Sequence, residues 1–283
     1  MRARTLAALS VALMLGIGGC GEDDEPAEGP SRDQVQRALD QAVEAGAPGI
    51  AVQLNGPHGN EFLTSGFAFL GPDHEITEED HFRTATVTES LTAAIAMQLV
   101  EEDELSLDEA VAQLSSGAPE AGTQLIEEVT QNSYEEELET RILAPLDLSE
   151  TTLVTDNGAA SPGVLITTPD DLATLYEALM AGALVGRDEL DVMMDTRPGA
   201  SDPPGPGRNR VGLGIYGWEV PCGEVWGQSD SYLRFRTLGG ARDEGTASIA
   251  FMVNATDVSG PTDEAILRAQ ELAICRALGK DAD

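Results

Sequence analysis

Lysine is almost absent from this chain of 283 residues: among 16 basic residues Lys280 is the only one, which leaves 15 arginines. Basic charge as a whole is scarce, since 50 Asp and Glu residues give a formal net charge of −34. Such a chain cannot assemble the basic face that phosphate binding requires, so we exclude nucleic acid as a partner. Direct adsorption to an anionic lipid surface is not expected either. The acidity suits a solvated surface in high salt.

Aromatic residues, histidine and cysteine are also few. Aromatic side chains make up 4% of the chain, so no stacking platform for sugars or bases stands out. The histidines are His58, His74 and His81, and no Gly-x-Ser-x-Gly motif occurs, which argues against a Ser-His-Asp hydrolase. His74, Glu78 and His81 have a helical spacing that a metal site can use, but so acidic a chain produces such clusters by chance. We predict no metal and no cofactor.

The N-terminus has the regions of a bacterial export signal. A basic start precedes an apolar stretch too short to span a bilayer comfortably, and the run LGIGGC at 15–20 resembles a lipobox. An ordinary cleaved signal peptide is the alternative. We expect residues 1–19 to be a lipoprotein signal peptide, Cys20 to carry the lipid, and residues 20–30 to be an acidic flexible tether. The membrane would then be a partner through the lipid anchor, at the cell membrane or the outer membrane.

Export would place the two remaining cysteines, Cys222 and Cys275, in an oxidising compartment. An even pair in that compartment predicts a disulfide, which would close a loop of about fifty residues. Two separate buried thiols are the alternative, because the sequence gives no distance between the two residues.

Hydrophobic periodicity and capping residues divide the rest of the chain into helices and strands. Ser31 and Gln34 form a capping box that opens a helix ending at Gly46. A segment from Thr88 to Glu102 is apolar on most of its circumference, which predicts a helix buried in a core. The other expected helices span 106–114, 133–143, 169–181 and 262–278, and the expected strands span 48–55, 61–69, 211–218, 231–238 and 246–253.

This order of elements predicts an α+β fold. The N- and C-terminal helices would cover an antiparallel sheet, and a helical subdomain at about 88–200 would be inserted between strands. Residues 31–283 would form this one domain.

One stretch resembles a known family. Residues 82–113, FRTATVTESLTAAIAMQLVEEDELSLDEAVAQ, are similar to the active-site helix of the serine β-lactamase and D-alanyl-D-alanine carboxypeptidase superfamily. The resemblance covers most of residues 34–279 and implies the same α+β fold with a shortened helical subdomain. Further segments that carry it are GAPGIAVQLN (46–55), VTQNSYEEELETRILAPLDLSETTL (129–153), VLITTPDDLATLYEALMAG (164–182) and VGLGIYGWEVPCGEVWG (211–227).

The first two catalytic motifs that the resemblance implies are lost. In the Ser-x-x-Lys motif of the family, a desolvated lysine with a lowered pKa activates the serine hydroxyl. This chain has Thr86 and Glu89 at those positions, and Lys280 lies beyond the last helix. The interval expected to hold the Tyr-x-Asn motif is shortened to residues 114–123, which contain neither Tyr nor Asn.

The third motif, Lys-Thr-Gly or His-x-Gly, is altered as well. The chain has Gln228, Ser229 and Asp230 in its place, so the glycines are gone. Those glycines let a substrate backbone approach the strand closely, and we expect the side chains of Ser229 and Asp230 to obstruct the groove.

Three independent losses predict a domain that binds without catalysing. We expect a non-catalytic binding or regulatory pseudoenzyme in the cell envelope, acting on peptidoglycan peptides or on a cell-wall enzyme such as an active relative. A divergent serine/threonine hydrolase, an esterase or carboxypeptidase, is the first alternative; it would use Thr86, Thr88 or Ser90 with Glu89 as the base. The second alternative is a lipoprotein that only presents an acidic, salt-tolerant coat.

Overall fold

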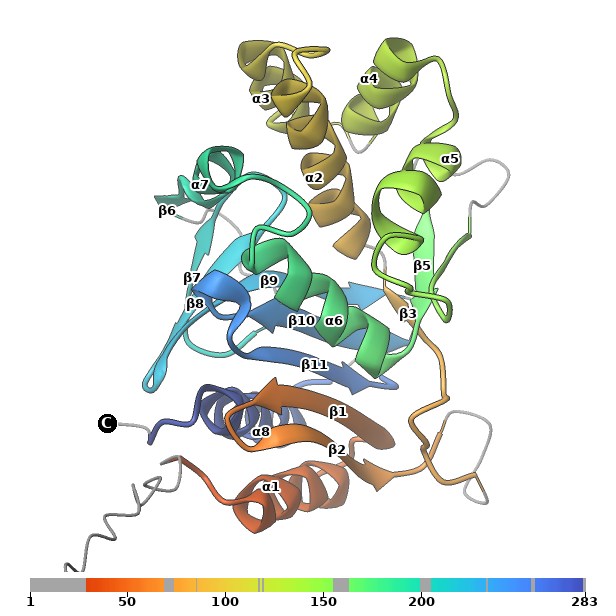
Figure 1. Cartoon of the computed structure of the whole chain (residues 1–283). Helices are drawn as coiled ribbons and strands as arrows, with labels where there is room; N and C mark the ends of the chain where they lie inside the picture. Colours follow the sequence, from red (N-terminus) through yellow and green to blue (C-terminus); the bar gives the residue numbers. More distant parts are fainter. Residues whose placement is uncertain are drawn as a thin grey trace, which may run out of the picture.

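An eight-stranded antiparallel sheet runs through the part of the chain that the structure describes (Figure 1). The structure is a computed structural model, and that part comprises residues 29–68, 74–84, 86–116, 118, 120–154, 163–198, 205–232, 234–255 and 258–281. The predicted signal peptide, Cys20 and most of the tether lie outside it. The strand order is β2-β1-β11-β10-β9-β8-β7-β6. The strands span Gly49–Gly56 (β1), Gly59–Gly66 (β2), Arg197–Pro198 (β6), Arg208–Val211 (β7), Tyr216–Val220 (β8), Gly223–Tyr232 (β9), Phe235–Ala241 (β10) and Ser248–Val253 (β11).

The two terminal helices cover one face of this sheet, as predicted. They are α1 (Arg32–Glu44) and α8 (Pro261–Leu278), which lie side by side (Figure 1). The predicted capping box of Ser31 is complete at the start of α1. Ile50 and Phe251 point into the core beneath these helices, whereas the next residue along each strand belongs to the core on the opposite face. This alternation is the period of two that a strand with both faces covered must show.

The opposite face carries α6 and the helical subdomain (Figure 1). Within the described residues this subdomain contains α2 (Val87–Glu101), α3 (Leu107–Leu114), α4 (Ala121–Thr130), α5 (Tyr134–Leu138) with a π-helical turn at Glu139–Leu143, and α7 (Arg187–Met194); α6 spans Pro169–Met180. A three-stranded sheet lies beside these helices, with the order β3-β5-β4 and the bounds Phe82–Thr84 (β3), Thr152–Val154 (β4) and Val164–Thr167 (β5). A 3₁₀ turn at Asp243–Gly245 precedes β11.

The helix α2 is buried on most of its circumference, as its apolar sequence predicted. Hydroxyl groups also fix it from two sides. The Ser90 hydroxyl lies 2.7 Å from the Gly214 carbonyl oxygen and 3.1 Å from the Tyr176 hydroxyl. The Thr92 hydroxyl lies 3.0 Å from the Tyr134 hydroxyl. Buried polar groups that are paired in this way hold a helix in one position.

Two predicted strands have the wrong bounds. The expected strand 231–238 spans the turn between β9 and β10, where Arg234 has a φ of 73°. The expected strand 211–218 is divided between the end of β7 and β8 by a turn that contains Gly214, whose φ is 72°. Arginine rarely adopts a left-handed conformation, so the sequence carries no signal for the first turn.

The predicted disulfide between Cys222 and Cys275 is confirmed: the two sulfur atoms lie 2.09 Å apart. Cys222 lies in the turn between β8 and β9, and Cys275 lies on α8. The disulfide therefore ties the C-terminal helix to the half of the sheet that contains β9.

Replacing Cys222 and Cys275 together by alanine should lower the free energy of unfolding by about 3–5 kcal/mol, because the disulfide restricts the unfolded chain over a long loop. Urea denaturation of the variant and of the oxidised protein measures this difference. The unaltered protein under strong reductant is the matched control and should resemble the variant. Equal stability of all three samples would show that the disulfide contributes nothing.

Candidate functional site

The N-terminus of α2 meets β9, so the structure brings the predicted positions of the first and third motifs together. Thr86 is the residue before α2, and Gln228, Ser229 and Asp230 lie on β9. The short strand β3 leads the chain to this point. It is held to the large sheet at its end, where the Thr237 hydroxyl lies 3.2 Å from the Thr84 hydroxyl.

The hydroxyl and the backbone N–H of Thr86 are both hydrogen-bonded to β9. Its hydroxyl donates a hydrogen bond to the carbonyl oxygen of Ser229 at 3.1 Å. Its backbone N–H donates to a carboxylate oxygen of Asp230 at 3.2 Å. The side chains of Gln228, Ser229 and Asp230 are all buried. The hydroxyl and the N–H of Thr86 therefore both have hydrogen-bond partners on β9.

The carboxylate of Asp230 lies at the positive end of α2. Helix N-termini stabilise anions because their first N–H groups have no partner within the helix and the helix dipole is positive there. In acyl transfer, backbone N–H groups placed beside the nucleophile stabilise the negative oxygen of the tetrahedral intermediate. In this chain the N–H of Thr86 already has an internal anion as its partner.

Glu89 lies in the first turn of α2, next to the same strand. One of its carboxylate oxygens accepts a hydrogen bond from the Gln228 side chain at 3.4 Å. The carboxyl is reached from an adjoining cavity, yet the protein atoms packed around it and the negative charge of Asp230 raise the pKa of Glu89 above its usual 4.5. Within the described residues no basic side chain bonds to Thr86 or Glu89. The side chains of Glu89 and Asp230 therefore make this part of the site acidic.

The other hydroxyls on this turn are buried in the protein. Thr88 and Ser90 have no exposed surface. Ser90 donates to the Gly214 carbonyl and neighbours Tyr176, whose pKa is raised by burial. A hydroxyl in this position holds α2 against its neighbours and cannot meet a substrate.

A cavity of about 430 Å³ adjoins Glu89 between α2, α3, α7 and the β7–β8 turn. We call it the Glu89 cavity. Gly214 in its floor permits the close approach of this turn to α2, because a Cβ at that position would lie 2.6 Å from the Cβ of Ala93. The shortened interval without the Tyr-x-Asn motif begins at this cavity. The lining residues are Glu89, Val111, Leu114, Ser115, Val192, Asp195, Val211, Gly212, Leu213, Gly214, Ile215 and Tyr216.

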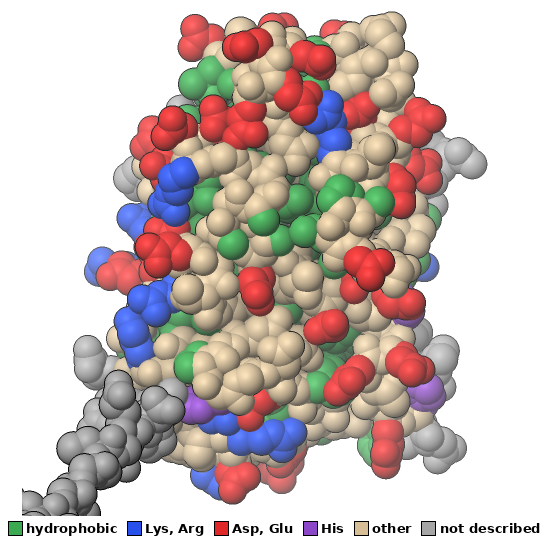
Figure 2. Space-filling view, in the orientation of Figure 1, with side chains coloured by type: hydrophobic (Ala, Val, Ile, Leu, Met, Phe, Trp, Pro, Cys, Tyr) green, Lys and Arg blue, Asp and Glu red, His purple; other side chains and the backbone are tan. Residues whose placement is uncertain are grey.

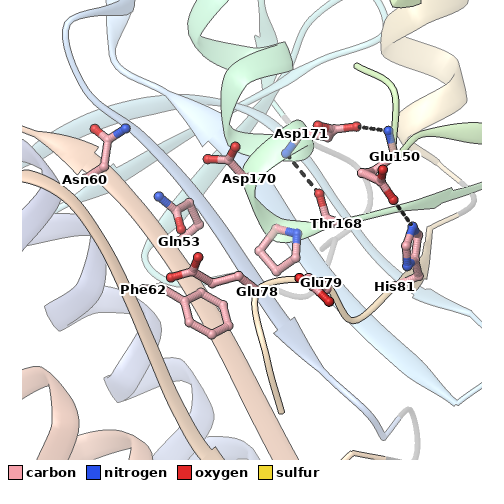
Figure 3. Close-up of a pocket in the computed structure, with 11 residues that line it drawn as sticks. Gln53, Asn60, Phe62, Glu78, Glu79, His81, Glu150, Thr168, Asp170 and Asp171 are labelled. Atoms are coloured by element: carbon pink, nitrogen blue, oxygen red, sulfur yellow. Dashed lines mark hydrogen bonds and ion pairs between the residues drawn. The ribbon is translucent and has the colours of Figure 1, made fainter. Parts of the chain in front are cut away.

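A second cavity of about 660 Å³ lies away from these residues, between the β1–β2 hairpin and the start of α6 (Figure 3). Five carboxylates line it, from Glu78, Glu79, Glu150, Asp170 and Asp171. Glu150 is held by its neighbours, since its side chain pairs with His81 at 3.2 Å and its N–H donates to Asp171 at 3.1 Å (Figure 3). None of the altered motif positions lines this cavity.

The two histidines of the acidic segment have separate partners. His74 lies 3.1 Å from Asp80, and His81 lies 3.2 Å from Glu150. Across the described ranges no group of three or more His, Cys, Asp or Glu side chains could hold a metal ion. Acidic side chains are spread over the whole visible face of the molecule, whereas basic ones are fewer (Figure 2).

Comparisons with known proteins agree with the geometry. A family model described as Beta-lactamase matches residues 121–273, which is more than half of the chain and includes β9 but not Thr86 or Glu89. Among solved structures, the D-amino acid amidase from Ochrobactrum anthropi SV3 in complex with L-phenylalanine amide shares 19% identity over 85% of this chain and 96% of that chain, with a TM-score of 0.72.

Two further structures have the same fold. The D-stereospecific amidohydrolase from Streptomyces sp. shares 20% identity over 85% of this chain and 98% of that chain, with a TM-score of 0.67. The octameric penicillin-binding protein homologue from Pyrococcus abyssi shares 16% identity over 88% of this chain and 78% of that chain, with a TM-score of 0.69. At these identities the likeness shows a common architecture.

Replacing Glu89 by glutamine should stabilise the protein at pH 7. The raised pKa means that ionising Glu89 costs free energy in the folded state, and stability is therefore lost as the pH rises through that pKa. Below about pH 4, where Glu89 is protonated in both the folded and the unfolded state, the variant should have no such advantage. Urea denaturation between pH 3 and pH 7 measures the difference.

The matched variant is Asp230→Asn, which removes the neighbouring charge. This substitution should lower the pKa of Glu89, which is measured by NMR titration of labelled glutamate carboxyl carbons. A stability difference between Glu89→Gln and the unaltered protein that does not change with pH would contradict this electrostatic account.

Proposed function

The chain belongs to the beta-lactamase family, and from this we propose that it is a non-catalytic member that binds a small ligand without forming an acyl-enzyme. The observation that carries the proposal is the contact of Asp230 with the N–H of Thr86. An acyl-enzyme needs a free hydroxyl, a base bonded to it and N–H donors for the oxyanion. The Thr86 hydroxyl and N–H are both engaged by β9, and Glu89 is bonded to Gln228 instead of Thr86.

The charges at the site also oppose acyl transfer. A tetrahedral intermediate at Thr86 would place a negative oxygen close to Asp230 and Glu89. In a partly buried site like charges repel one another by several kcal/mol, at an effective dielectric constant of about 20. No basic side chain bonds to Thr86 or Glu89 among the described residues to offset this repulsion.

The Glu89 cavity supports a binding role. Its volume of about 430 Å³ lies within the range of small-molecule sites. It adjoins the altered motifs, and it lies where α3 ends and the shortened interval begins. In the D-amino acid amidase the ligands are phenylalanine and its amide, which are molecules of a size that such a cavity holds.

A divergent serine/threonine hydrolase is the second candidate, and the raised pKa of Glu89 is the observation that favours it. Such an enzyme would use Thr86 as nucleophile with Glu89 as base. Hydrolysis of p-nitrophenyl esters and D-Ala-D-Ala peptides, with Thr86→Ala and Glu89→Gln as variants, decides between the two candidates. Hydrolytic activity that each of the two substitutions abolishes would establish that the protein is a hydrolase.

We also propose that Cys20 anchors the domain by lipid outside the cytoplasm, where peptidoglycan peptides or an active cell-wall enzyme would be its partners. The lipobox at residues 15–20 and the disulfide between Cys222 and Cys275 support export. Within the described ranges no helix has both the length and the apolar character needed to cross a bilayer.

Replacing Cys20 by alanine should move the protein from the membrane fraction to the soluble extracytoplasmic fraction, because acyl chains on Cys20 supply the anchor. Fractionation and metabolic labelling with a fatty-acid analogue measure the change. Replacing Ser31 by alanine is a control outside the lipobox and should leave the distribution unaltered. Membrane association that survives Cys20→Ala would contradict the lipid anchor.

A fluorescent penicillin should form no covalent adduct with the protein. The double variant Thr86→Ser with Glu89→Lys, which restores the residues of the first motif, should also remain unlabelled because Asp230 still engages the N–H at residue 86. Denaturing gel electrophoresis with fluorescence detection measures the adduct, with an active penicillin-binding protein as the positive control. Labelling of the unaltered protein that disappears in Thr86→Ala would overturn the proposed function.

A further inference from the structure

The charges that line the Glu89 cavity are negative. Glu89 lines it from α2, and Asp195 lines it from the end of α7. None of its described lining residues is lysine, arginine or histidine. A carboxylate that entered would face both acids without a counter-charge, whereas an ammonium or guanidinium group would find two partners. The cavity therefore favours a cation and disfavours an anion.

The remaining walls are largely apolar. They come from α3, α7 and the β7–β8 segment, so apolar side chains line the cavity on several sides. Aliphatic groups that enter such a cavity are removed from water, which is favourable in proportion to the area buried. A hydrated inorganic cation gains nothing from these walls. The apolar lining residues are Val111, Leu114, Val192, Val211, Leu213 and Ile215.

The carboxylate of Glu89 can accept a further hydrogen bond. One oxygen of its carboxylate accepts from Gln228 at 3.4 Å, and a carboxylate provides about four acceptor positions. The protein atoms packed around the carboxyl and the charge of Asp230 already make the ionised form unfavourable, as the raised pKa shows. A bound cation would offset both effects, which means that binding and ionisation of Glu89 support each other.

We propose that the Glu89 cavity binds a small organic cation, an ammonium or guanidinium group on an aliphatic body, with the cationic group at Glu89 and the aliphatic body against the α3 and α7 walls. The inference rests on the proposed binding function and names its ligand class. A cavity of this kind differs from a site that binds a ligand carboxylate, because Glu89 and Asp195 would repel a negatively charged ligand.

Three probes of equal length test the proposal: hexylammonium, hexanol and hexanoate, titrated by isothermal calorimetry into the full domain at pH 7 and fixed salt. Hexylammonium should bind at least about tenfold more tightly than hexanol, which is about 1.4 kcal/mol. Hexanoate should give no measurable binding. Binding of hexanoate at or above the affinity of hexylammonium would overturn the proposal.

Two charge variants locate the cationic group. Glu89→Gln should weaken hexylammonium about tenfold and leave hexanol unchanged, because only the charged partner is lost. Glu150→Gln is the matched control: it removes the same charge from the second cavity and should alter the affinity for hexylammonium less than about twofold. Equal effects of the two substitutions would show that hexylammonium responds only to the overall charge, and the proposal would fail.

A third variant tests the walls. Val111→Trp should fill the cavity from α3 and abolish the binding of hexylammonium and hexanol alike, with near-UV circular dichroism to confirm that the domain is folded. Unaltered binding in the folded variant would show that the probes bind outside the Glu89 cavity.

The two proposals can fail separately. A penicillin adduct at Thr86 together with hexylammonium binding would overturn the proposed function alone. The absence of both the adduct and hexylammonium binding would overturn this inference alone.

Discussion

The interaction on which the site depends is the hydrogen bond from the N–H of Thr86 to the carboxylate of Asp230. The start of a helix has N–H groups without partners and a positive dipole end, so it attracts an anion. When β9 supplies that anion, the start of α2 is satisfied within the protein. The protein atoms packed around Glu89, the next acid along the helix, raise its pKa, and the nearby charge of Asp230 raises it further. The carboxylate of Asp230 thus engages the N–H of Thr86 and also acts on Glu89, which lines the cavity beside it.

The architecture does not depend on the residues at the predicted motif positions Thr86 and Glu89, because neither belongs to the two hydrophobic cores. The sheet is covered on one face by α1 and α8 and on the other by α6 and the helical subdomain. The helix α2 keeps its position through hydroxyls one turn beyond the altered motif, including Ser90 with Tyr176. The fold of such a scaffold does not rest on the side chains of Thr86 and Glu89, since neither residue is part of a hydrophobic core.

Features with a local cause could be predicted from the sequence, and features with a tertiary cause could not. Capping residues located α1 and α6, and an all-round apolar pattern located α2 in the core. The turn at Arg234 was missed because a left-handed arginine leaves no signal, and β3, β4 and β5 are too short for a periodic pattern. At the site, the sequence predicted Thr86, Glu89 and Gln228 as motif positions, and the structure places them beside one another. The bond to Asp230 depends on the distance between β9 and α2. The cavity depends on the packing of α2 and α3 against α7 and the β7–β8 turn, which lie much further along the chain.

The overall acidity and the negative cavity act over different ranges. A net charge of −34 attracts cations to the whole surface, but this attraction weakens as salt screens it; the screening length falls to about 3 Å at 1 M ionic strength. The burial of an aliphatic body against the walls of the cavity does not depend on charge and is not screened in this way. In concentrated salt the surface would therefore discriminate little between cations, and the Glu89 cavity would still prefer those with an aliphatic body. Selectivity would then come from the walls of the cavity, while the surface charge keeps the domain solvated.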